Sequence, residues 1–168
     1  MSDSTIQDSI ETQATGTMSS ATPKFWETKK LAEMTTAEWE SLCDSCGKCC
    51  LHKLEDEETG DIAFTSVVCD LIDLDTCRCT RYTERCTLVP ECLDLKQHAF
   101  AEYNWLPDTC AYRLLTDGKP LPAWHPLLTG DPGSVKAAGI AISSYAIKEA
   151  EVEDMEDHII GWLCKSAD

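Results

Sequence analysis

The clearest change in the hydrophobic pattern lies between residues 51 and 68, where apolar and polar side chains alternate. Leu54 precedes a polar segment at residues 55 to 60, and Ile62 and Phe64 follow it at a spacing of two. A period of two is typical of a β-strand with one buried face. We therefore predict a β-hairpin whose acidic turn is solvated, because that turn lacks the ligand spacing of an EF-hand calcium loop.

Before this hairpin, the pattern predicts a helix at about residues 36 to 42. Thr35-Thr36-Ala37-Glu38 has the form of a capping box, and Met34 and Trp39 are placed to form the flanking hydrophobic staple. Such a helix places Cys43 directly after its C-terminal end.

The other elements that the pattern predicts are short. They are a helix or turn at 25–31, helices at 95–104 and 109–116, a proline-rich loop at 119–129, a turn at 131–134, a strand near 139–147 and a weakly helical acidic segment at 152–159. Asp108 is the expected N-cap of the helix at 109–116, and Gly118 lies past its end. The expected fold class is α+β, a small single domain of short helices and a β-hairpin organised around a cysteine metal cluster.

The totals are consistent with one domain. A chain of 168 residues allows a modest core. Residues 1 to 22 are rich in Ser, Thr and Gln, a composition that buries too little surface to offset ordering, so we expect a disordered tail there. The metal-binding domain is expected at residues 23 to 163, with Cys164 in a frayed terminus.

Net charge and the search for targeting signals limit the expected cellular location and the expected partners. The formal net charge is -16, and no basic face is large enough to neutralise many phosphates, so nucleic acid is not an expected partner. No apolar run approaches the length of a membrane helix, and residues 1 to 22 carry no secretory signal. We expect a cytoplasmic protein with reduced thiols and no membrane partner.

Residues 43 to 50 hold four of the 11 cysteines. The C-x-x-C spacing of Cys43 and Cys46 lets both thiolates reach one ion at about 2.3 Å, and Gly47 suits a turn at positive φ. Disulfides are disfavoured, because the cysteine count is odd and a bond between neighbouring Cys49 and Cys50 would close a strained ring. In extended backbone those two side chains would point to opposite sides, so the hypothesis is more than one ion, or one larger cluster.

A second cysteine region runs from residue 69 to residue 92. It holds Cys69, Cys77, Cys79, Cys86 and Cys92, interleaved with Arg78, Arg81 and Arg85. Apolar anchors are few here, so metal coordination is expected to supply folding energy. The arginines would either offset thiolate charge or pair with neighbouring carboxylates. Farther along, Cys110 is expected in the first turn of a helix, as a distant ligand or as a packed side chain.

Known catalytic signatures are absent from the sequence. There is no G-x-S-x-G, H-E-x-x-H, Walker A or dinucleotide-binding motif. Of the histidines His52, His98, His125 and His158, only His52 lies near the cysteine stretch, where it is a candidate ligand or supporting group. We identify no catalytic constellation and favour a binding protein over an enzyme.

These residues together resemble the YcgN-like cysteine-cluster proteins of bacteria. The resemblance runs from about Phe25 to Trp162. It rests on Cys43-x-x-Cys46-x-x-Cys49-Cys50, Leu51-His52-Lys53-Leu54, Cys69, Cys77-x-Cys79, Cys92, Trp105-Leu106-Pro107, Thr109-Cys110-Ala111-Tyr112-Arg113-Leu114-Leu115 and Leu121-Pro122-Ala123-Trp124-His125-Pro126-Leu127.

The resemblance implies a domain that chelates zinc or iron. The ligand set it implies is Cys43, Cys46, Cys49, Cys50, Cys69, Cys77, Cys79, Cys92 and Cys110, with Cys86 and Cys164 outside the pattern. We expect a mainly structural metal. The alternative is a redox or transferase-type protein with a 4Fe-4S cluster, since a similar C-x-x-C-x-x-C-C domain occurs in flagellin lysine methylases.

Overall fold

The computed structural model describes residues 23–97 and 105–163, and it confirms a small α+β fold. The α-helices are α1 (Phe25–Thr28), α2 (Thr36–Ser41), α3 (Arg85–Leu88), α4 (Ala111–Thr116), α5 (Pro126–Thr129) and α6 (Ser134–Ala137). The strands are β1 (Leu51–Glu55), β2 (Ile62–Val68), β3 (Ile72–Asp73), β4 (Arg78–Cys79), β5 (Ile147–Lys148) and β6 (Ile159–Leu163). Short 3₁₀ turns include η2 (Lys48–Cys50), η4 (Leu95–Gln97), η6 (Ile142–Ser144), η7 (Glu149–Glu151) and η8 (Glu156–His158).

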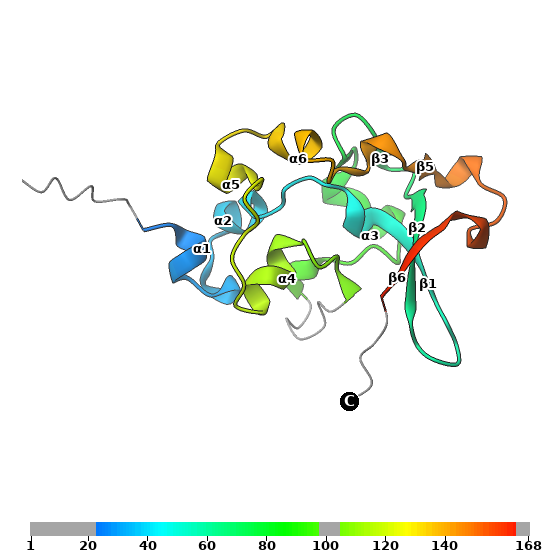
Figure 1. Ribbon diagram of the computed structural model, residues 1–168, viewed down its shortest axis with the longest axis horizontal. Coiled ribbons are helices and arrows are strands. Elements are labelled where there is room, and N and C mark those ends of the chain that lie inside the picture. The colour runs from blue at the N-terminus through cyan, green and yellow to red at the C-terminus, as the bar shows by residue number, and fades with distance from the viewer. Residues whose placement is uncertain (1–22, 98–104, 164–168) are drawn as a thin grey trace, which may run out of the picture.

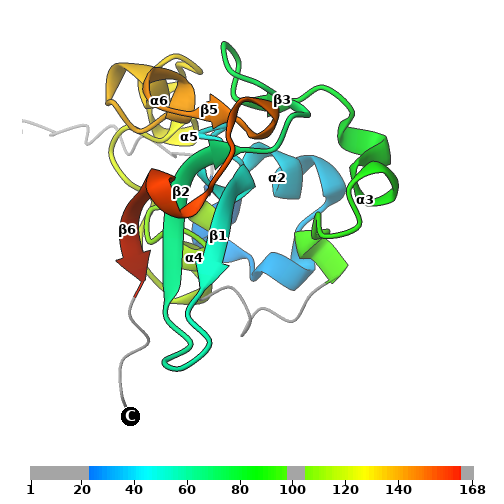
Figure 2. The same cartoon turned by 90° about the vertical axis from the view of Figure 1, so that its right-hand side faces the viewer.

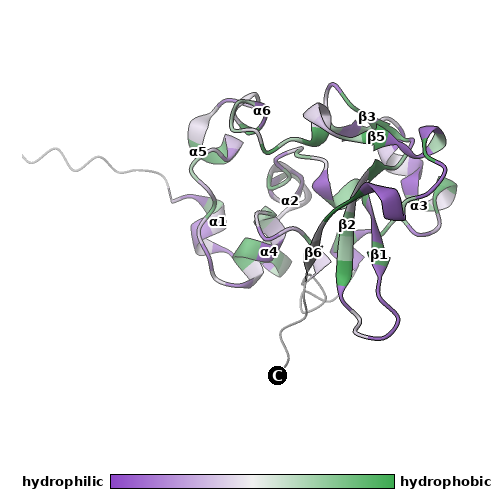
Figure 3. Cartoon of the chain, turned by 45° about the vertical axis from the view of Figure 1, so that its right-hand side comes forward, coloured by the Kyte–Doolittle hydropathy of each residue, from purple (hydrophilic) through white to green (hydrophobic). Residues whose placement is uncertain are grey.

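Strand β2 is the centre of the main sheet. It pairs antiparallel with β1 from Leu51↔Val68 to Glu55↔Ile62, which confirms the predicted hairpin. Its other edge is shared by β6, antiparallel, and β5, parallel. Figure 2 shows β6 beside β2 and the long hairpin turn extending away from the sheet, and Figure 3 shows that this turn is hydrophilic. Strands β3 and β4 form a separate two-stranded ladder.

Two apolar clusters lie on either side of the cysteine stretch. Helices α1, α2, α4 and α5 lie in one half of the molecule and the main sheet in the other (Figure 1). The first cluster gathers Leu31, Met34, Trp39, Leu42, Leu106, Ala111, Tyr112 and Leu121; the second gathers Cys46, Leu51, Val68, Ile72, Cys77, Val135, Ala141 and Ile142. The cysteine stretch therefore connects Leu42 in one cluster to Leu51 in the other.

The predicted capping box is present at the start of α2. The Thr35 side chain accepts a hydrogen bond from the Glu38 backbone N–H at 3.3 Å, and Glu38 Oε2 accepts one from the Thr35 N–H at 2.8 Å. Two of the donors that a helix start leaves unpaired are thereby satisfied. The buried ring of Trp39 then fixes the helix against Tyr112, with the ring centroids 4.7 Å apart.

Several sequence predictions for the second half are wrong. No strand covers 139–147: Gly139, at φ +70°, ends α6, and the segment then forms η6 with only β5 as a strand. Residues 119–129 are not all loop, because Pro126 occupies the first turn of α5, where it needs no N–H partner. Cys110, not Asp108, is the N-cap of α4.

The predicted ends of the chain also differ from the structure. Ile159 begins strand β6 instead of closing a helical segment, because β2 leaves an edge that an apolar strand can cover. Of the helix predicted at 95–104, the described part is the 3₁₀ turn η4 at Leu95–Gln97. The predicted disordered tail at 1–22 and the frayed Cys164 lie outside the described residues.

His125 links the loop before α5 to the end of α2. It is fully buried, and its Nε2 lies 3.1 Å from the Leu42 carbonyl oxygen while its Nδ1 accepts from the Leu127 N–H at 3.1 Å. Nδ1 is an acceptor, so Nε2 carries the proton and donates to Leu42. Burial lowers the pKa of His125, which keeps the ring neutral and this pairing intact.

We expect His125→Ala to lower the free energy of unfolding by about 2–4 kcal/mol, because two buried hydrogen bonds and side-chain volume are lost. Wild-type stability should also fall as pH drops below about 6.5, since the unfolded chain then binds a proton that the folded His125 refuses. Denaturant unfolding from pH 5 to 8 measures both. The half-buried His158 provides the control substitution, His158→Ala, with an expected cost below about 1 kcal/mol. An unchanged pH slope in His125→Ala would contradict the assignment.

Candidate metal centre

The turn after α2 takes the shape expected of a metal-binding knuckle. Gly47 lies at φ +78°, and a Cβ there would come within 2.6 Å of the Ile142 side chain, so only glycine fits. Ser45 and Cys77 also adopt positive φ, 60° and 54°, which is uncommon for residues with a side chain. Such conformations are held only where surrounding structure imposes them, and here all three lie in the cysteine segments.

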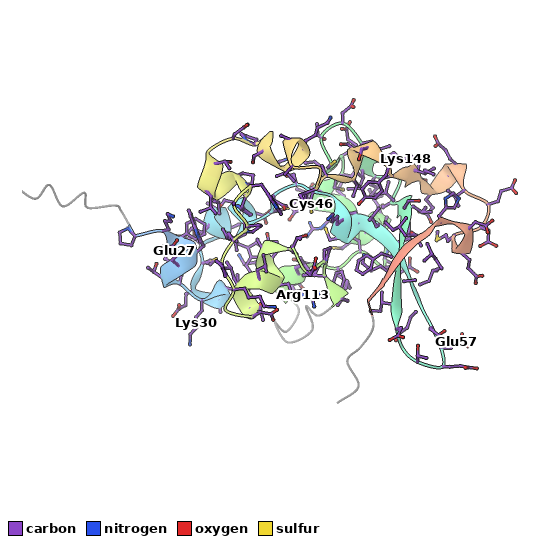
Figure 4. All side chains as sticks on the ribbon, viewed as in Figure 1. Glu27, Lys30, Cys46, Glu57, Arg113 and Lys148 are labelled. Carbon is purple, nitrogen blue, oxygen red and sulfur yellow. The ribbon has the colours of Figure 1, made fainter. Side chains whose placement is uncertain are left out.

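Distant segments are hydrogen-bonded onto this turn. The Ile142 N–H donates to the Cys46 carbonyl at 3.0 Å, and the Cys69 N–H donates to the Cys50 carbonyl at 3.3 Å. The second bond follows from the hairpin, because β2 runs back alongside β1 and leaves Cys69 at its end. The predicted hairpin therefore brings Cys69 back to the first cysteine stretch. Figure 4 places Cys46 near the centre of the molecule.

Four thiols are related through the charge of Cys49 and form what we call the first thiol group: Cys43, Cys46, Cys49 and Cys110. By solvent accessibility Cys43 and Cys49 are exposed, Cys110 is half-buried and Cys46 is buried. Desolvation by neighbouring atoms, followed by the charge of Cys49, raises the pKa of Cys43 to about 11 and that of Cys110 to about 12. Burial also raises the pKa of Cys46, with the charges of Asp44 and Cys49 adding to it. Cys49 is therefore the common neighbour of the other three sulfurs.

A second thiol group lies towards the β3–β4 ladder and consists of Cys50, Cys69, Cys79, Cys86 and Cys92. The charges of Cys92 and Cys69 contribute to the raised pKa of Cys50. Burial raises the pKa of Cys92 to about 11, and the charges of Cys86, Cys69 and Cys79 add to that rise. Cys86 was left out of the ligand set predicted from sequence; its position near Cys92 is a signal that only the fold provides.

The two thiol groups meet at Cys49 and Cys50. These residues lie in the 3₁₀ turn η2, so the premise that they are extended and point apart is wrong. Their sulfurs are 3.9 Å apart, close to the ~3.8 Å between two thiolates on one tetrahedral ion with ~2.3 Å bonds. The hydrogen bond from Cys50 lowers the pKa of Cys49 to about 7 and raises that of Cys50. Cys49 is therefore the most acidic thiol of the pair and the better metal donor near neutral pH.

Lys53 places a positive charge beside this pair. Its Nζ donates to the carbonyl oxygens of Leu51 at 2.7 Å and Cys49 at 3.0 Å. The ammonium lies 5.4 Å from the ring centroids of both Phe64 and Trp105, an arrangement in which two aromatic faces stabilise one cation. Burial lowers the pKa of Lys53, whereas the charges of Cys49 and Cys50 raise it.

Asp44 is a buried carboxylate within the first thiol group. It is only 8% exposed, and its Oδ1 accepts a hydrogen bond from the Cys46 N–H at 3.0 Å. Its Oδ2 is also buried, and among the described residues no donor reaches it in hydrogen-bonding geometry. Sequence reasoning did not single out Asp44, because a C-x-x-C motif leaves its intervening residues unspecified.

Other predicted residues lie elsewhere or have other partners. Cys77 packs in the second apolar cluster, with its thiol 3.8 Å from the Leu74 carbonyl oxygen. His52 Nε2 lies 3.2 Å from Glu149 Oε2, His125 is in the core, and His98 falls outside the described residues. In residues 23–97 and 105–163, no three His, Cys, Asp or Glu side chains have donor atoms placed to hold a metal ion.

Both readings of the arginines find support. Arg81 Nε lies 2.7 Å from Glu84 in a surface pairing, and Arg85 lies 3.6 Å from Asp94 in a half-buried one. Arg78 and Arg85 also lower the pKa values of Cys43 and Cys92, against the larger effect of burial. Two of the three guanidinium groups therefore offset thiolate charge.

Comparison with known proteins places this region in a described domain. Residues 42–111 match the family described as "Putative zinc- or iron-chelating domain". The UPF0260 protein of Rhizorhabdus wittichii is 57% identical over 136 residues, 81% of this chain and 93% of that protein. The UPF0260 protein YcgN of Salmonella newport is 52% identical over 144 residues, 86% of this chain and 94% of that protein.

No solved structure matches the chain significantly. The matched domain covers the knuckle and both thiol groups, and its description supports metal binding by this region. Over four-fifths of this chain, more than half of the residues are identical to those of the relative from Rhizorhabdus wittichii. The chain therefore belongs to the UPF0260 family of YcgN-like proteins.

Proposed function

We propose that this protein binds zinc or iron through its cysteine thiolates and that the metal is chiefly structural. The proposed ligands are drawn from Cys43, Cys46, Cys49, Cys50, Cys69, Cys77, Cys79, Cys92 and Cys110. The single observation that carries the proposal is the meeting of two thiol groups, from segments far apart in sequence, at the Cys49–Cys50 pair.

The donor chemistry suits such a metal. Thiolates are soft ligands that select zinc and iron over magnesium or calcium. The described side chains do not hold three donors ready around one point, so binding requires some thiols to change rotamer and lose their protons. Metal binding coupled to deprotonation and ordering is the usual behaviour of small cysteine-rich sites.

A structural role follows from the sparse packing around the second thiol group. In η3 (Tyr82–Glu84), α3 and η4 no residue is buried, and Tyr82, Leu88 and Leu93 are exposed. Apolar burial therefore contributes little to holding residues 81 to 97. Thiolates tied to a metal would supply that missing stability.

The second candidate is a 4Fe-4S cluster in a redox or transferase-type protein. The C-x-x-C-x-x-C run Cys43, Cys46 and Cys49 with Cys110 provides an all-cysteine donor set of the kind such clusters use. The proline that follows the last cysteine of the ferredoxin motif is absent, since Cys50 is followed by Leu51. This observation favours the first candidate without removing the second.

We further propose a cytoplasmic protein that binds no nucleic acid and that acts as a binding protein more than as an enzyme. Reduced thiols are the state that metal binding requires, and the net charge of -16 disfavours phosphate backbones. In the described part of the chain, no helix has the length and apolarity needed to span a membrane.

Anaerobic purification followed by metal and sulfide analysis tests the proposal directly. We expect bound zinc or iron in stoichiometric amount, and we expect a chelator to abolish the cooperative thermal melt. A colourless zinc protein removes the cluster alternative, whereas a brown protein with stoichiometric sulfide supports it. If chelator-treated protein contained no metal and still melted cooperatively at the same temperature, the structural role would be wrong.

Lys53→Met tests whether the buried ammonium supports the thiolates. Methionine preserves an apolar side chain between Phe64 and Trp105 but removes the charge beside Cys49. We expect the variant to lose metal to a competing chromophoric chelator about tenfold faster than wild type. Lys53→Arg keeps the charge and is the matched control, with release close to the wild-type rate. Equal rates for Lys53→Met and wild type would contradict this role.

A further inference from the structure

Asp44 combines two features that its place in a turn does not explain together. One carboxylate oxygen is used locally, since Oδ1 accepts the Cys46 N–H at 3.0 Å and closes a short turn between the two cysteines. The other oxygen, Oδ2, is buried with no donor in hydrogen-bonding geometry among the described residues. A surface turn of this kind normally leaves its second oxygen in water.

The surroundings of Oδ2 indicate what would satisfy it. Buried polar atoms are hydrogen-bonded in nearly all proteins, and a buried carboxylate without a partner is costly unless a cation binds it. The acidic groups around it are the thiols of Cys43, Cys46, Cys49 and Cys110, and the Asp44 charge contributes a rise to the pKa of each. The Lys53 ammonium does not pair with Oδ2, because it donates its hydrogen bonds to backbone carbonyl oxygens.

We propose that Asp44 is itself a metal ligand, and that Oδ2 joins thiolates of the first thiol group in a mixed thiolate–carboxylate site. This site forms as the thiols reorient around the ion, because the described side chains do not hold three donors ready. This inference rests on the proposed metal-binding function and adds an oxygen donor to a site otherwise described by its cysteines. Zinc and iron both accept carboxylate oxygen beside sulfur, at about 2.0–2.2 Å for zinc.

The arrangement of the turn supports a direct role. The hydrogen bond to Oδ1 fixes the carboxylate plane, so Oδ2 is held in place before any ion arrives. Preorientation of this kind lowers the ordering cost of binding. A lone aspartate in a flexible loop would not have this advantage, and the 8% exposure of Asp44 shows that it is not free to turn towards solvent.

Asp44→Asn separates the ligand role from the turn. The asparagine side-chain oxygen can still accept the Cys46 N–H, but the second position becomes an NH₂ group, which cannot coordinate a metal. Asp44→Ala removes both functions. Asp56→Asn is the matched control, because Asp56 Oδ1 accepts from the Glu58 and Thr59 N–H groups in the exposed hairpin turn, away from the sulfurs.

The measurements are metal content after purification and the rate of metal release to a chromophoric chelator, made on the full chain. We expect Asp44→Asn to release metal at least about tenfold faster than wild type, and Asp56→Asn to match wild type. Substitution with cobalt(II) adds a signature of the ligands: the wild-type d–d bands should be those of a mixed sulfur–oxygen site, and Asp44→Asn should shift or lose them.

Each outcome decides the matter. If Asp44→Asn binds metal like wild type while Asp44→Ala binds it weakly, Asp44 only closes the turn and the proposal is overturned. If Asp44→Asn leaves the cobalt spectrum unchanged, the carboxylate is likewise no ligand. If wild-type protein holds no zinc, iron or cobalt, both the proposed metal binding and the role of Asp44 are overturned. If wild type and Asp44→Asn bind metal equally well, only the role of Asp44 is overturned.

Discussion

The proximity of many thiols to one another is the main physical constraint on the cysteine segments, because desolvation and neighbouring charges disfavour their charged forms. The chain brings sulfurs from several segments into two adjoining groups in a protein that is already strongly acidic. The hydrogen bond between Cys50 and Cys49 lowers the pKa of Cys49 and raises that of Cys50. Desolvation and neighbouring charges raise the pKa values of four other thiols, those of Cys43, Cys46, Cys92 and Cys110. A bound cation takes the place of the thiol protons and offsets the negative charge of several thiolates. It thereby reduces both the cost of desolvating the thiolates and the repulsion between them.

Contacts from later in the chain hold the cysteine stretch and the helix before it in place. The cysteine stretch runs between two apolar clusters, and three contacts from later in the chain fix it: His125 to the Leu42 carbonyl, Ile142 N–H to the Cys46 carbonyl, and the Tyr112 hydroxyl to the Trp39 carbonyl at 2.9 Å. All three bind backbone oxygens of α2 or the knuckle. The position of Cys43 and Cys46 is therefore set by the polypeptide and not by sulfur chemistry alone.

Local signals in the sequence predicted the local structure well. The capping box at Thr35, the period of two around Phe64 and the positive φ of Gly47 are each determined by a few neighbouring residues, and all three are confirmed. The strand expected at 139–147 is absent because Gly139 ends a helix and the segment then packs on the knuckle, which depends on tertiary contacts.

The candidate metal site also has features that the sequence predicts and others that only the fold shows. The resemblance named the family correctly, whereas the set of cysteine ligands stays a prediction. Neither could predict that Cys49 and Cys50 share a 3₁₀ turn, that Cys86 lies near Cys92, or that Asp44 has a buried oxygen without a donor. Each of these depends on which distant segments cover a given side chain.

The position of β6 has a consequence for how the chain reaches its native state. On one edge β2 pairs with β1, its immediate neighbour in sequence. Within the part of the chain that the structure describes, its opposite edge is covered only by residues 147–148 and 159–163. During synthesis the hairpin can form long before those residues leave the ribosome, and until then a row of backbone donors and acceptors stays open to pairing with another nascent chain. The acidic tip of the hairpin then acts as a gatekeeper, since its like charges oppose such pairing.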